Sequence, residues 1–367
     1  MWKVIRTCTL ILAAASPCFA ADAPSFVNKP DAWFATDQGK TVVANIISWE
    51  LPAGGWYKAY DALKPNTAPI PHEFPPATSP EAAAATQRER GSWDNVATID
   101  NNATHSELRI LARAVTLQNN PAAKAAFFKG LDALLAAQYP NGGFSQRFPP
   151  ANNYGRYITF NDGAMIGALE VLQDIANDHP PYQFVDPPRR EKARIAVQKG
   201  IDCILNCQIL RNGQPTCWCA QHDEKNLAPA PARAYELPSL SGQEGAGVAL
   251  FLMHLHNPDA RIRRAVEGAA AWFDQVKITG KRVTFIRTPD GKRDRILVND
   301  PHSTLWARFY DIDTNQPFFC GRDGIKKPHL ADIERERRAG YAWYGNWGAK
   351  VATEFAQWQK QNPVGNP

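Results

Sequence analysis

The sequence has no apolar run long enough to cross a bilayer after its first 20 residues. A membrane-spanning helix needs about 20 consecutive apolar residues. The chain also lacks a strong charge bias, with 41 Lys and Arg against 36 Asp and Glu, and no basic run resembles a nucleic-acid-binding tail. We therefore expect neither a membrane nor a nucleic acid as a partner. A hydrophobic content of 44% is enough for a substantial core.

Residues 1–20 have the pattern of a secretory signal. Two basic residues precede a short apolar run, and a small-x-small site ends at Ala20. We expect cleavage after Ala20 and secretion into the periplasm or the extracellular medium. The mature chain, 21–367, is then expected to be a single catalytic domain with a small basic excess, which is compatible with an anionic polymer as substrate.

The cysteines do not form a familiar metal motif. Cys217 and Cys219 lie near His222, but a structural zinc site usually has two spaced pairs of ligands. Export favours one or two disulfides with an odd thiol left over. The pairing stays open among Cys203, Cys207, Cys217, Cys219 and Cys320.

Apolar residues at helical spacing dominate the chain, whereas strand-like alternation is scarce. The best short strand is 283–286, before a possible Asp290-Gly291 turn. The periodicity predicts helices over 104–118, 121–138, 162–177, 188–210, 241–256, 259–276 and 338–359.

A glycine turn followed by an aromatic residue recurs along the chain. It occurs at Gly55-Trp56, at Gly143-Phe144, at Gly213 before Trp218 and more faintly at Gly280. Such a period indicates stacked or circularly arranged helical hairpins, although glycine turns can also simply end helices. We predict a mainly α fold, an (α/α) toroid-type barrel of helical hairpins with short β segments. The Pro- and Ala-rich residues 60–98 are a possible insertion.

Two polar clusters stand directly before predicted helices. Asp100-Asn101 and Asn161-Asp162 offer hard oxygen ligands of the kind that calcium prefers. The alternative is that these side chains cap the helices that follow. Two such pairs meeting in space could share an ion that neither would bind alone.

Two further clusters are rich in polar, charged and aromatic residues. Residues 219–239 contain His222, Asp223, Arg233 and Tyr235, and could instead be an ordinary surface loop. Residues 308–327 begin at Arg308 and include Arg322. These arginines could hold carboxylates through paired hydrogen bonds, or could be solvated surface charges.

In this order, the four clusters resemble family 10 of the polysaccharide lyases, the pectate lyases with a helical toroid-type catalytic domain. The resemblance extends from Trp49 to Trp347, and its most specific pieces are DNNAT, FNDGAM, CAQHD with ARAYELPSLSG, and RFYDIDTN with GRDG. The family's Gly-Gly-Trp-Pro turns read differently here, as in Gly143-Phe144-Ser145.

The resemblance implies a role for individual residues. Asp100 and Asp162 correspond to calcium-site acids, with Asn101 beside them, and Arg233 corresponds to the catalytic base. Arg308 and Arg322 correspond to arginines that hold substrate carboxylates. We add four polar residues of the clusters as substrate-binding candidates: Asn161, His222, Asp223 and Tyr235.

The expected activity is that of a monomeric pectate lyase. It would cleave α-1,4-polygalacturonate by calcium-assisted β-elimination and release 4,5-unsaturated oligogalacturonates. Arginine has an ordinary pKa of about 12.5–13.8, so a base role for Arg233 predicts an alkaline activity optimum.

Two other functions remain open from the sequence. An inverting glycoside hydrolase would use Asp100 and Asp162 as acid and base, with carboxyl groups about 6.5–9.5 Å apart. A non-catalytic polysaccharide-binding protein would use aromatic side chains to stack on sugars. The products distinguish these functions, because only elimination creates a conjugated double bond.

Overall fold

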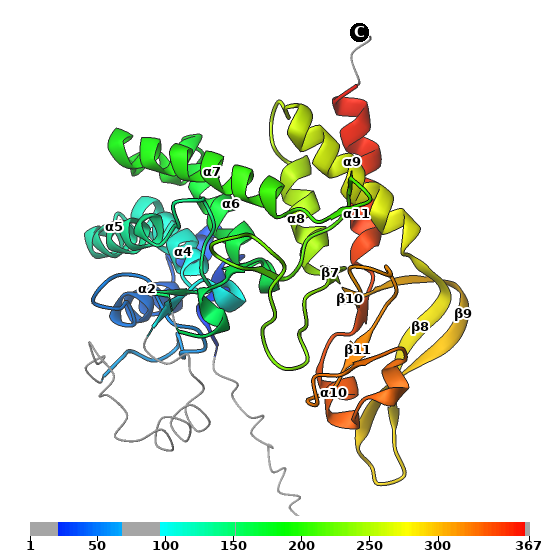
Figure 1. The fold of residues 1–367 in the computed structure, drawn as a ribbon. Coiled ribbons are helices and arrows are strands. Elements are labelled where there is room, and N and C mark those ends of the chain that lie inside the picture. The colour runs from blue at the N-terminus through cyan, green and yellow to red at the C-terminus, as the bar shows by residue number, and fades with distance from the viewer. Residues whose placement is uncertain (1–20, 68–95, 151, 364–367) are drawn as a thin grey trace, which may run out of the picture.

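The computed structural model describes residues 21–67, 96–150 and 152–363 (Figure 1). The predicted signal, 1–20, and most of the possible insertion at 60–98 lie outside the described residues. Within the described part of the chain, every helix is too short or too polar to span a membrane.

Helical hairpins make up most of the structure. Six of the seven predicted helices are confirmed, and they pack as three successive pairs. The seventh, 338–359, is divided into α10 (Arg335–Gly340) and α11 (Trp347–Gln361). Two helices, α1 (Asp31–Phe34) and α2 (Asp37–Ser48), come first. The three pairs follow: α4 (His105–Leu117) with α5 (Pro121–Ala136), α6 (Ala164–Ala176) with α7 (Pro187–Cys207), and α8 (Glu244–Met253) with α9 (Ala260–Gln275).

The two helices of each hairpin begin differently. The second helices, α5, α7 and α9, start at ordinary Asx caps, in which Asn120, Asp186 and Asp259 accept backbone N–H groups of the first turn. In the described structure, the N-cap residues of α4, α6 and α8 accept no such bond through their side chains. The polar residues before the first helices are therefore available for another role.

Three tryptophans of the recurring aromatic series hydrogen-bond their turn to the helix before it, whereas Phe144 packs without such a bond. Trp56 donates its indole N–H to the carbonyl of Ile46 in α2, and Trp218 donates to Ile204 in α7. Trp306 makes the same bond to Phe273 in α9, so it is the fourth member of the series. The predicted repeat is thus confirmed, but its fourth aromatic follows Gly280 only after a long β-ribbon.

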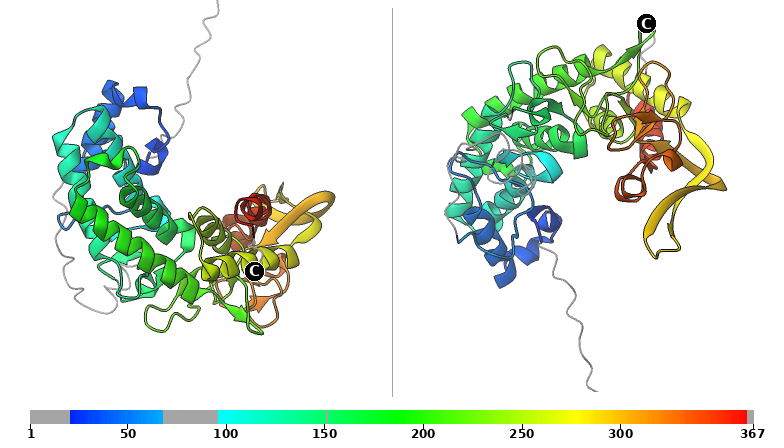
Figure 2. Two further views of the ribbon diagram at one scale, coloured as in Figure 1. Left: turned by 90° about the horizontal axis from the view of Figure 1, so that it is seen from above. Right: turned by 60° about the horizontal axis from the view of Figure 1, so that its bottom comes forward.

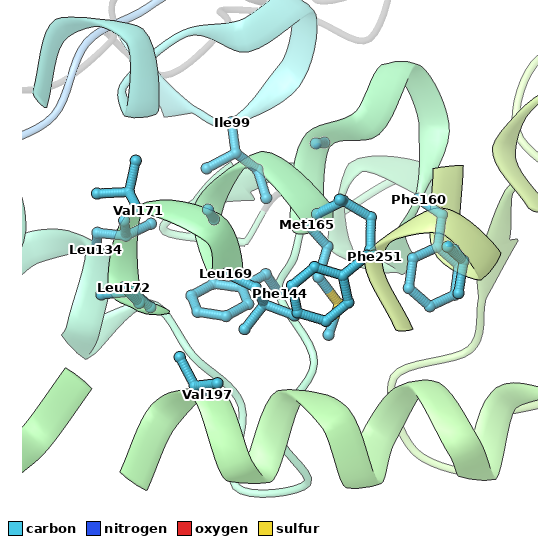
Figure 3. Close-up of a cluster of buried hydrophobic side chains, with 14 of the residues drawn as sticks. Ile99, Leu134, Phe144, Phe160, Met165, Leu169, Val171, Leu172, Val197 and Phe251 are labelled. Atoms are coloured by element: carbon cyan, nitrogen blue, oxygen red, sulfur yellow. The ribbon is translucent and has the colours of Figure 1, made fainter. Parts of the chain in front are cut away.

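The hydrophobic core is centred on α6. Met165, Leu169 and Leu172 of this helix are fully buried. Figure 3 shows them in one cluster with Phe144, from the preceding turn, and Val197 of α7. This packing fixes the N-terminal end of α6, where Asn161 and Asp162 precede the helix.

The prediction of a mainly α toroid-type barrel is wrong. The structure contains 46% helix and 17% strand, with the strands in small antiparallel sheets. The described hairpins follow an open arc, and a two-stranded ribbon extends from its C-terminal end (Figure 2).

The ribbon consists of β8 (Ile278–Arg287) and β9 (Arg293–Ala307), and β13 (Tyr344–Gly345) pairs with the base of β9. Only 283–286 was predicted as strand. A hydrophobic alternation arises where one face of a strand is buried, and most residues of this ribbon are exposed or half-buried.

Short strand pairs precede the first helix of each hairpin. All three pairs are antiparallel, and residues 100–102 and 161–163, which follow the first strands of two of them, contact each other. These pairs are β1 (Ala97–Thr98) with β2 (Arg147–Phe148), β3 (Ile158–Thr159) with β6 (Gln221–His222), and β7 (Leu240–Ser241) with β10 (Phe309–Tyr310). The remaining strands are β4 (Leu210–Arg211) with β5 (Gln214–Pro215), and β11 (Phe319–Cys320) with β12 (Lys326–Lys327).

Candidate active site

A cavity of about 280 Å³ is lined by the turn at residues 100–101, by the turn at residues 161–162 and by the loop formed by residues 219–237. It brings together five residues that the sequence predicted as site residues: Asp100, Asn101, Asn161, Asp162 and Arg233. Lys58, Tyr154, Glu236 and Phe309 also line it. The predicted meeting of the two Asp/Asn pairs is therefore confirmed.

The two Asp/Asn pairs occupy matching 3-10 turns, η2 (Asp100–Asn102) and η4 (Asn161–Gly163). In each turn the second residue has a left-handed backbone, with φ of 50° at both Asn101 and Asp162. Asn and Asp adopt this conformation more readily than other residues with a side chain. The local sequence therefore suits two equivalent turns with oxygen-bearing side chains.

Asp100 is buried and only partly paired. One carboxylate oxygen, Oδ2, forms an ion pair with Lys58. The other, Oδ1, is buried and has no hydrogen-bond partner among the described residues. Leaving a buried charged oxygen unpaired is costly, so this atom indicates a place for a cation or a polar ligand.

Asp162 lies among other charges. Burial raises the pKa of its carboxyl, and the nearby Glu244 and Asp100 raise it further, whereas Arg308 opposes the rise. The Arg308 guanidinium is 3.7 Å from Asp162 Oδ1. Acids crowded in this way gain stability when a cation binds between them.

Arg308 contacts the turn at Asn161–Gly163 but does not line the cavity. Its guanidinium donates to Asn161 Oδ1 at 3.3 Å and forms an ion pair with Glu244, whose side chain is fully buried. Although burial disfavours its charge, the acids around it raise the pKa of Arg308 above the usual value. The arginine thus holds Asn161 and Asp162 in place.

The sequence reasoning missed Glu244 and Lys58. Glu244 is the third of three polar residues that each come three positions after the hydroxyl residue ending a short strand. Asn101 follows Thr98, Asp162 follows Thr159, and Glu244 follows Ser241. Comparing the residues after β1, β3 and β7 reveals this pattern. Lys58 carries no such signal.

Arg233 forms a paired ion bridge to Glu236. Its Nε and Nη2 donate to the two carboxylate oxygens at 2.7 and 2.5 Å, and its backbone N–H also donates to Oε2. Burial opposes the charge of Arg233, but these bonds raise its pKa above the usual value. Glu236 is itself fixed by the Tyr341 hydroxyl, which donates to it at 2.7 Å.

The structure does not bring His222 or Asp223 to the cavity. His222 is buried, with Nδ1 bonded to the Leu227 carbonyl and Nε2 accepting from the Cys219 N–H. Burial lowers its pKa to about 4, so the ring is neutral near pH 7. Asp223 caps a turn by accepting from the backbone of Lys225 and Asn226. Both side chains shape the 219–237 loop.

Tyr235 and Arg322 lie beyond the cavity, on the C-terminal side of the arc. Tyr235 is buried, and the guanidinium of Arg233 lies 4.9 Å from its ring centroid. Arg322 is exposed and paired with Glu336 at 3.0 Å. Substrate contact by these two residues remains a prediction.

The cavity residues fit a calcium ion. Two carboxylates and two amides supply hard oxygens, and Asp100 Oδ1 still needs a partner in the described structure. No group of three or more His, Cys, Asp or Glu residues suited to a metal occurs in the described part of the chain. Calcium held here would therefore also need amide, water or substrate oxygens.

The cysteines of the described residues supply no metal site or disulfide. All five cysteines of the described residues are buried free thiols, so the predicted disulfides are wrong for this structure. Cys219 lines the cavity, and burial raises its pKa above the usual value.

Comparisons with known proteins agree on one family. Residues 51–352 match the model of a family described as pectic acid lyase. Two solved structures of a family 10 polysaccharide lyase from Cellvibrio cellulosa are similar, each with a TM-score of 0.73 and 32% identity over 91% of this chain. The match covers 95% of one and 96% of the other, which is a mutant in complex with trigalacturonic acid. No curated protein matches the chain.

Proposed function

Because the chain belongs to the pectic acid lyase family and is a polysaccharide lyase, we propose that it cleaves α-1,4-polygalacturonate by β-elimination. The products would be 4,5-unsaturated oligogalacturonates. The observation that carries this proposal is the cavity itself, in which an oxygen-rich, acidic side faces Arg233. A uronate carboxylate and the C5 proton beside it need these two kinds of group.

We propose that Asp100, Asn101, Asn161 and Asp162 hold Ca²⁺. When bound, calcium supplies positive charge that stabilises the carbanion-like charge developing at the uronate carboxylate. Lys58 and Arg308 each neutralise part of the acidic side, and Arg308 keeps Asn161 and Asp162 oriented. These two cations therefore reduce the electrostatic repulsion between the acidic side of the cavity and an anionic substrate.

Arg233 is the proposed acceptor of the C5 proton. It lines the cavity, and its pairing with Glu236 leaves Nη1 as the nitrogen with no hydrogen bond among the described residues. Because Glu236 favours the charged arginine, the neutral form is scarce near pH 7, and the rate should rise toward alkaline pH. Proton abstraction and expulsion of the C4 oxygen then leave the double bond between C4 and C5.

The proposal also covers the setting in which the enzyme works. It would be exported through the signal at residues 1–20 and would act as a monomer on the polymer. Arg322 and Tyr235 remain proposed substrate-binding residues on the C-terminal side of the cavity, whereas Arg308 is proposed to act through Asn161 and Asp162, which it holds in place.

One assay tests the reaction and the metal together. Ultraviolet absorbance should increase when the purified protein acts on polygalacturonate, should stop in chelator and should return with calcium. Asp162→Asn should need much more calcium for half-maximal rate, whereas Asp174→Asn on the exposed side of α6 should behave like the parent.

The possible negative results have distinct meanings. Saturated reducing ends without ultraviolet absorbance would show a hydrolase, and binding without turnover would show a carbohydrate-binding protein. Full activity in chelator would reject the calcium site while leaving the elimination reaction intact.

A further inference from the structure

One face of the β8–β9 ribbon carries three arginines around an exposed aromatic ring. The strand register places Phe285 opposite Arg295 and Arg287 opposite Arg293. Directly opposed residues share a face, and so do residues two apart in a strand. The four side chains Phe285, Arg287, Arg293 and Arg295 therefore form one patch, which we call the ribbon cluster.

The ribbon cluster has no acidic counterpart. None of its three arginines forms an ion pair with a carboxylate of the described residues, and like charges face each other across the strands. Two other positive charges of the ribbon are paired: Arg282, on the opposite face, contacts Asp300, and Lys292 in the turn contacts Asp290. Directly opposed like charges destabilise a sheet unless an anion lies between them.

The geometry of the cluster suits a ligand with carboxylate groups. The guanidinium carbons of Arg293 and Arg295 lie 3.5 and 4.7 Å from the centroid of the Phe285 ring. Phe285 is 41% exposed. Nε of Arg295 is buried and has no hydrogen-bond partner in the described structure. Because the Arg293 guanidinium stacks on the Phe285 ring, the ring holds this charge in a position where it can pair with a carboxylate.

The cluster is connected to the cavity by a short chain of contacts. Arg295 donates to the backbone carbonyl of Tyr341, and the Tyr341 hydroxyl donates to Glu236, which holds Arg233. The tip of the ribbon lies beside α10 at the C-terminal end of the arc (Figure 1). The ribbon is therefore anchored to the same framework as the proposed base.

We propose that the ribbon cluster binds the polygalacturonate chain outside the cavity, as an auxiliary contact for long substrates. This inference rests on the proposed function, because it takes the polymer of that reaction as its ligand. Uronate carboxylates would pair with Arg287 and with Arg293, whose guanidinium is held over the Phe285 ring. A trisaccharide held in the cavity would not use the contact.

A charge-matched pair of variants tests the proposal. Arg287→Gln with Arg293→Gln removes two charges from the cluster, and Arg282→Gln with Lys292→Gln removes two paired charges from the same ribbon. Each pair is combined with Arg233→Ala, so that binding is read without turnover. Calorimetry at fixed calcium should show affinity for polygalacturonate falling about tenfold in the cluster variant only, with trigalacturonate unchanged.

Three outcomes would overturn the proposal. The first is an unchanged affinity of the cluster variant for polygalacturonate. The second is an equal loss of affinity for trigalacturonate, or an equal loss in the control variant. The third is that heparin competes for the site as strongly as polygalacturonate does. Circular dichroism establishes that both variants fold. Failure of the lyase reaction is seen separately, as absent ultraviolet product in the parent enzyme, because the binding measurement requires no turnover.

Discussion

At the scale of single residues, the state of the proposed base depends on one neighbour. Glu236 is 7% exposed, accepts both side-chain bonds from Arg233 and is held by Tyr341. Although burial favours the neutral acid, Arg233 holds the pKa of Glu236 below its usual value. Both members of the pair are therefore charged, and the attraction of the Glu236 carboxylate opposes loss of the proton from Arg233.

Replacing Glu236 by Gln should move the alkaline limb of the pH–rate profile to lower pH. The carboxylate raises the pKa of Arg233, so removing its charge lowers that pKa and makes the neutral base more abundant. The maximal kcat should fall, because the two oxygens also orient the guanidinium. The measurement is the pH at which kcat reaches half its maximum.

Two reference variants make this result interpretable. Arg233→Ala should lose turnover and keep oligogalacturonate binding, whereas Tyr341→Phe removes one bond to Glu236 without removing a charge. An unmoved profile in Glu236→Gln, with turnover retained, would show that Arg233 is not the base.

The sequence indicated which residues come together where these side chains belong to short contiguous motifs. Asp100-Asn101 and Asn161-Asp162 were predicted to meet, and both line the cavity. His222 was expected at the substrate, but its two ring nitrogens are bonded to the backbone. The sequence cannot show which way a side chain in a long loop points, because long-range packing decides it.

At the scale of elements, the turns between units depend on close approach of backbones. Gly142 has a φ of 89°, and a Cβ at this position would lie 2.0 Å from the Lys199 carbonyl oxygen of α7. Gly213 occupies the corresponding turn of the next unit with a φ of 74°, and a Cβ there would meet no described atom within 4 Å. A side chain at Gly213 would therefore meet backbone strain alone, whereas a side chain at Gly142 would meet both backbone strain and a steric clash.

Changing each glycine to Ala should therefore give unequal losses of stability. Gly213→Ala should lower the free energy of unfolding by about 1 kcal/mol through left-handed strain alone. Gly142→Ala should cost about 3 kcal/mol or more, because the turn must also move away from α7. Urea unfolding followed by circular dichroism measures both, and equal losses would contradict the close approach.

The elements that the sequence predicted well are those whose pattern is local. Asn120 and Asp186 cap α5 and α7 just where the apolar periodicity begins, so these helices could be placed accurately. The ribbon was mostly missed because residues such as Arg287 and Arg293 give it no buried face. Trp306 was missed as the fourth aromatic because the ribbon separates it from its glycine turn.

At the scale of the whole molecule, the arc depends on contacts that no local pattern shows. A series of hairpins could close a ring or follow an open curve, and here α11 packs against α8 and α9 at the end of the series. Burial in this arrangement also favours the uncharged form of two acids. Burial raises the pKa of Glu107 to about 8 and that of Glu50 to about 7, despite the hydrogen bond from Tyr60 and the nearby Lys129.

These two acids should make the fold less stable at the alkaline pH that favours the reaction. The folded chain keeps both protons well above the ordinary pKa of 4.5, whereas the unfolded chain releases them. The stabilisation is therefore complete below about pH 4.5 and is lost as pH rises toward about 8, by roughly 1.4 kcal/mol per pH unit for each acid. Glu107→Gln should flatten the fall in unfolding free energy between pH 5 and pH 8, measured with urea, while Glu267→Gln on the exposed face of α9 should leave it unchanged. A parent protein whose stability does not fall over this range would show that Glu107 is charged in the folded state.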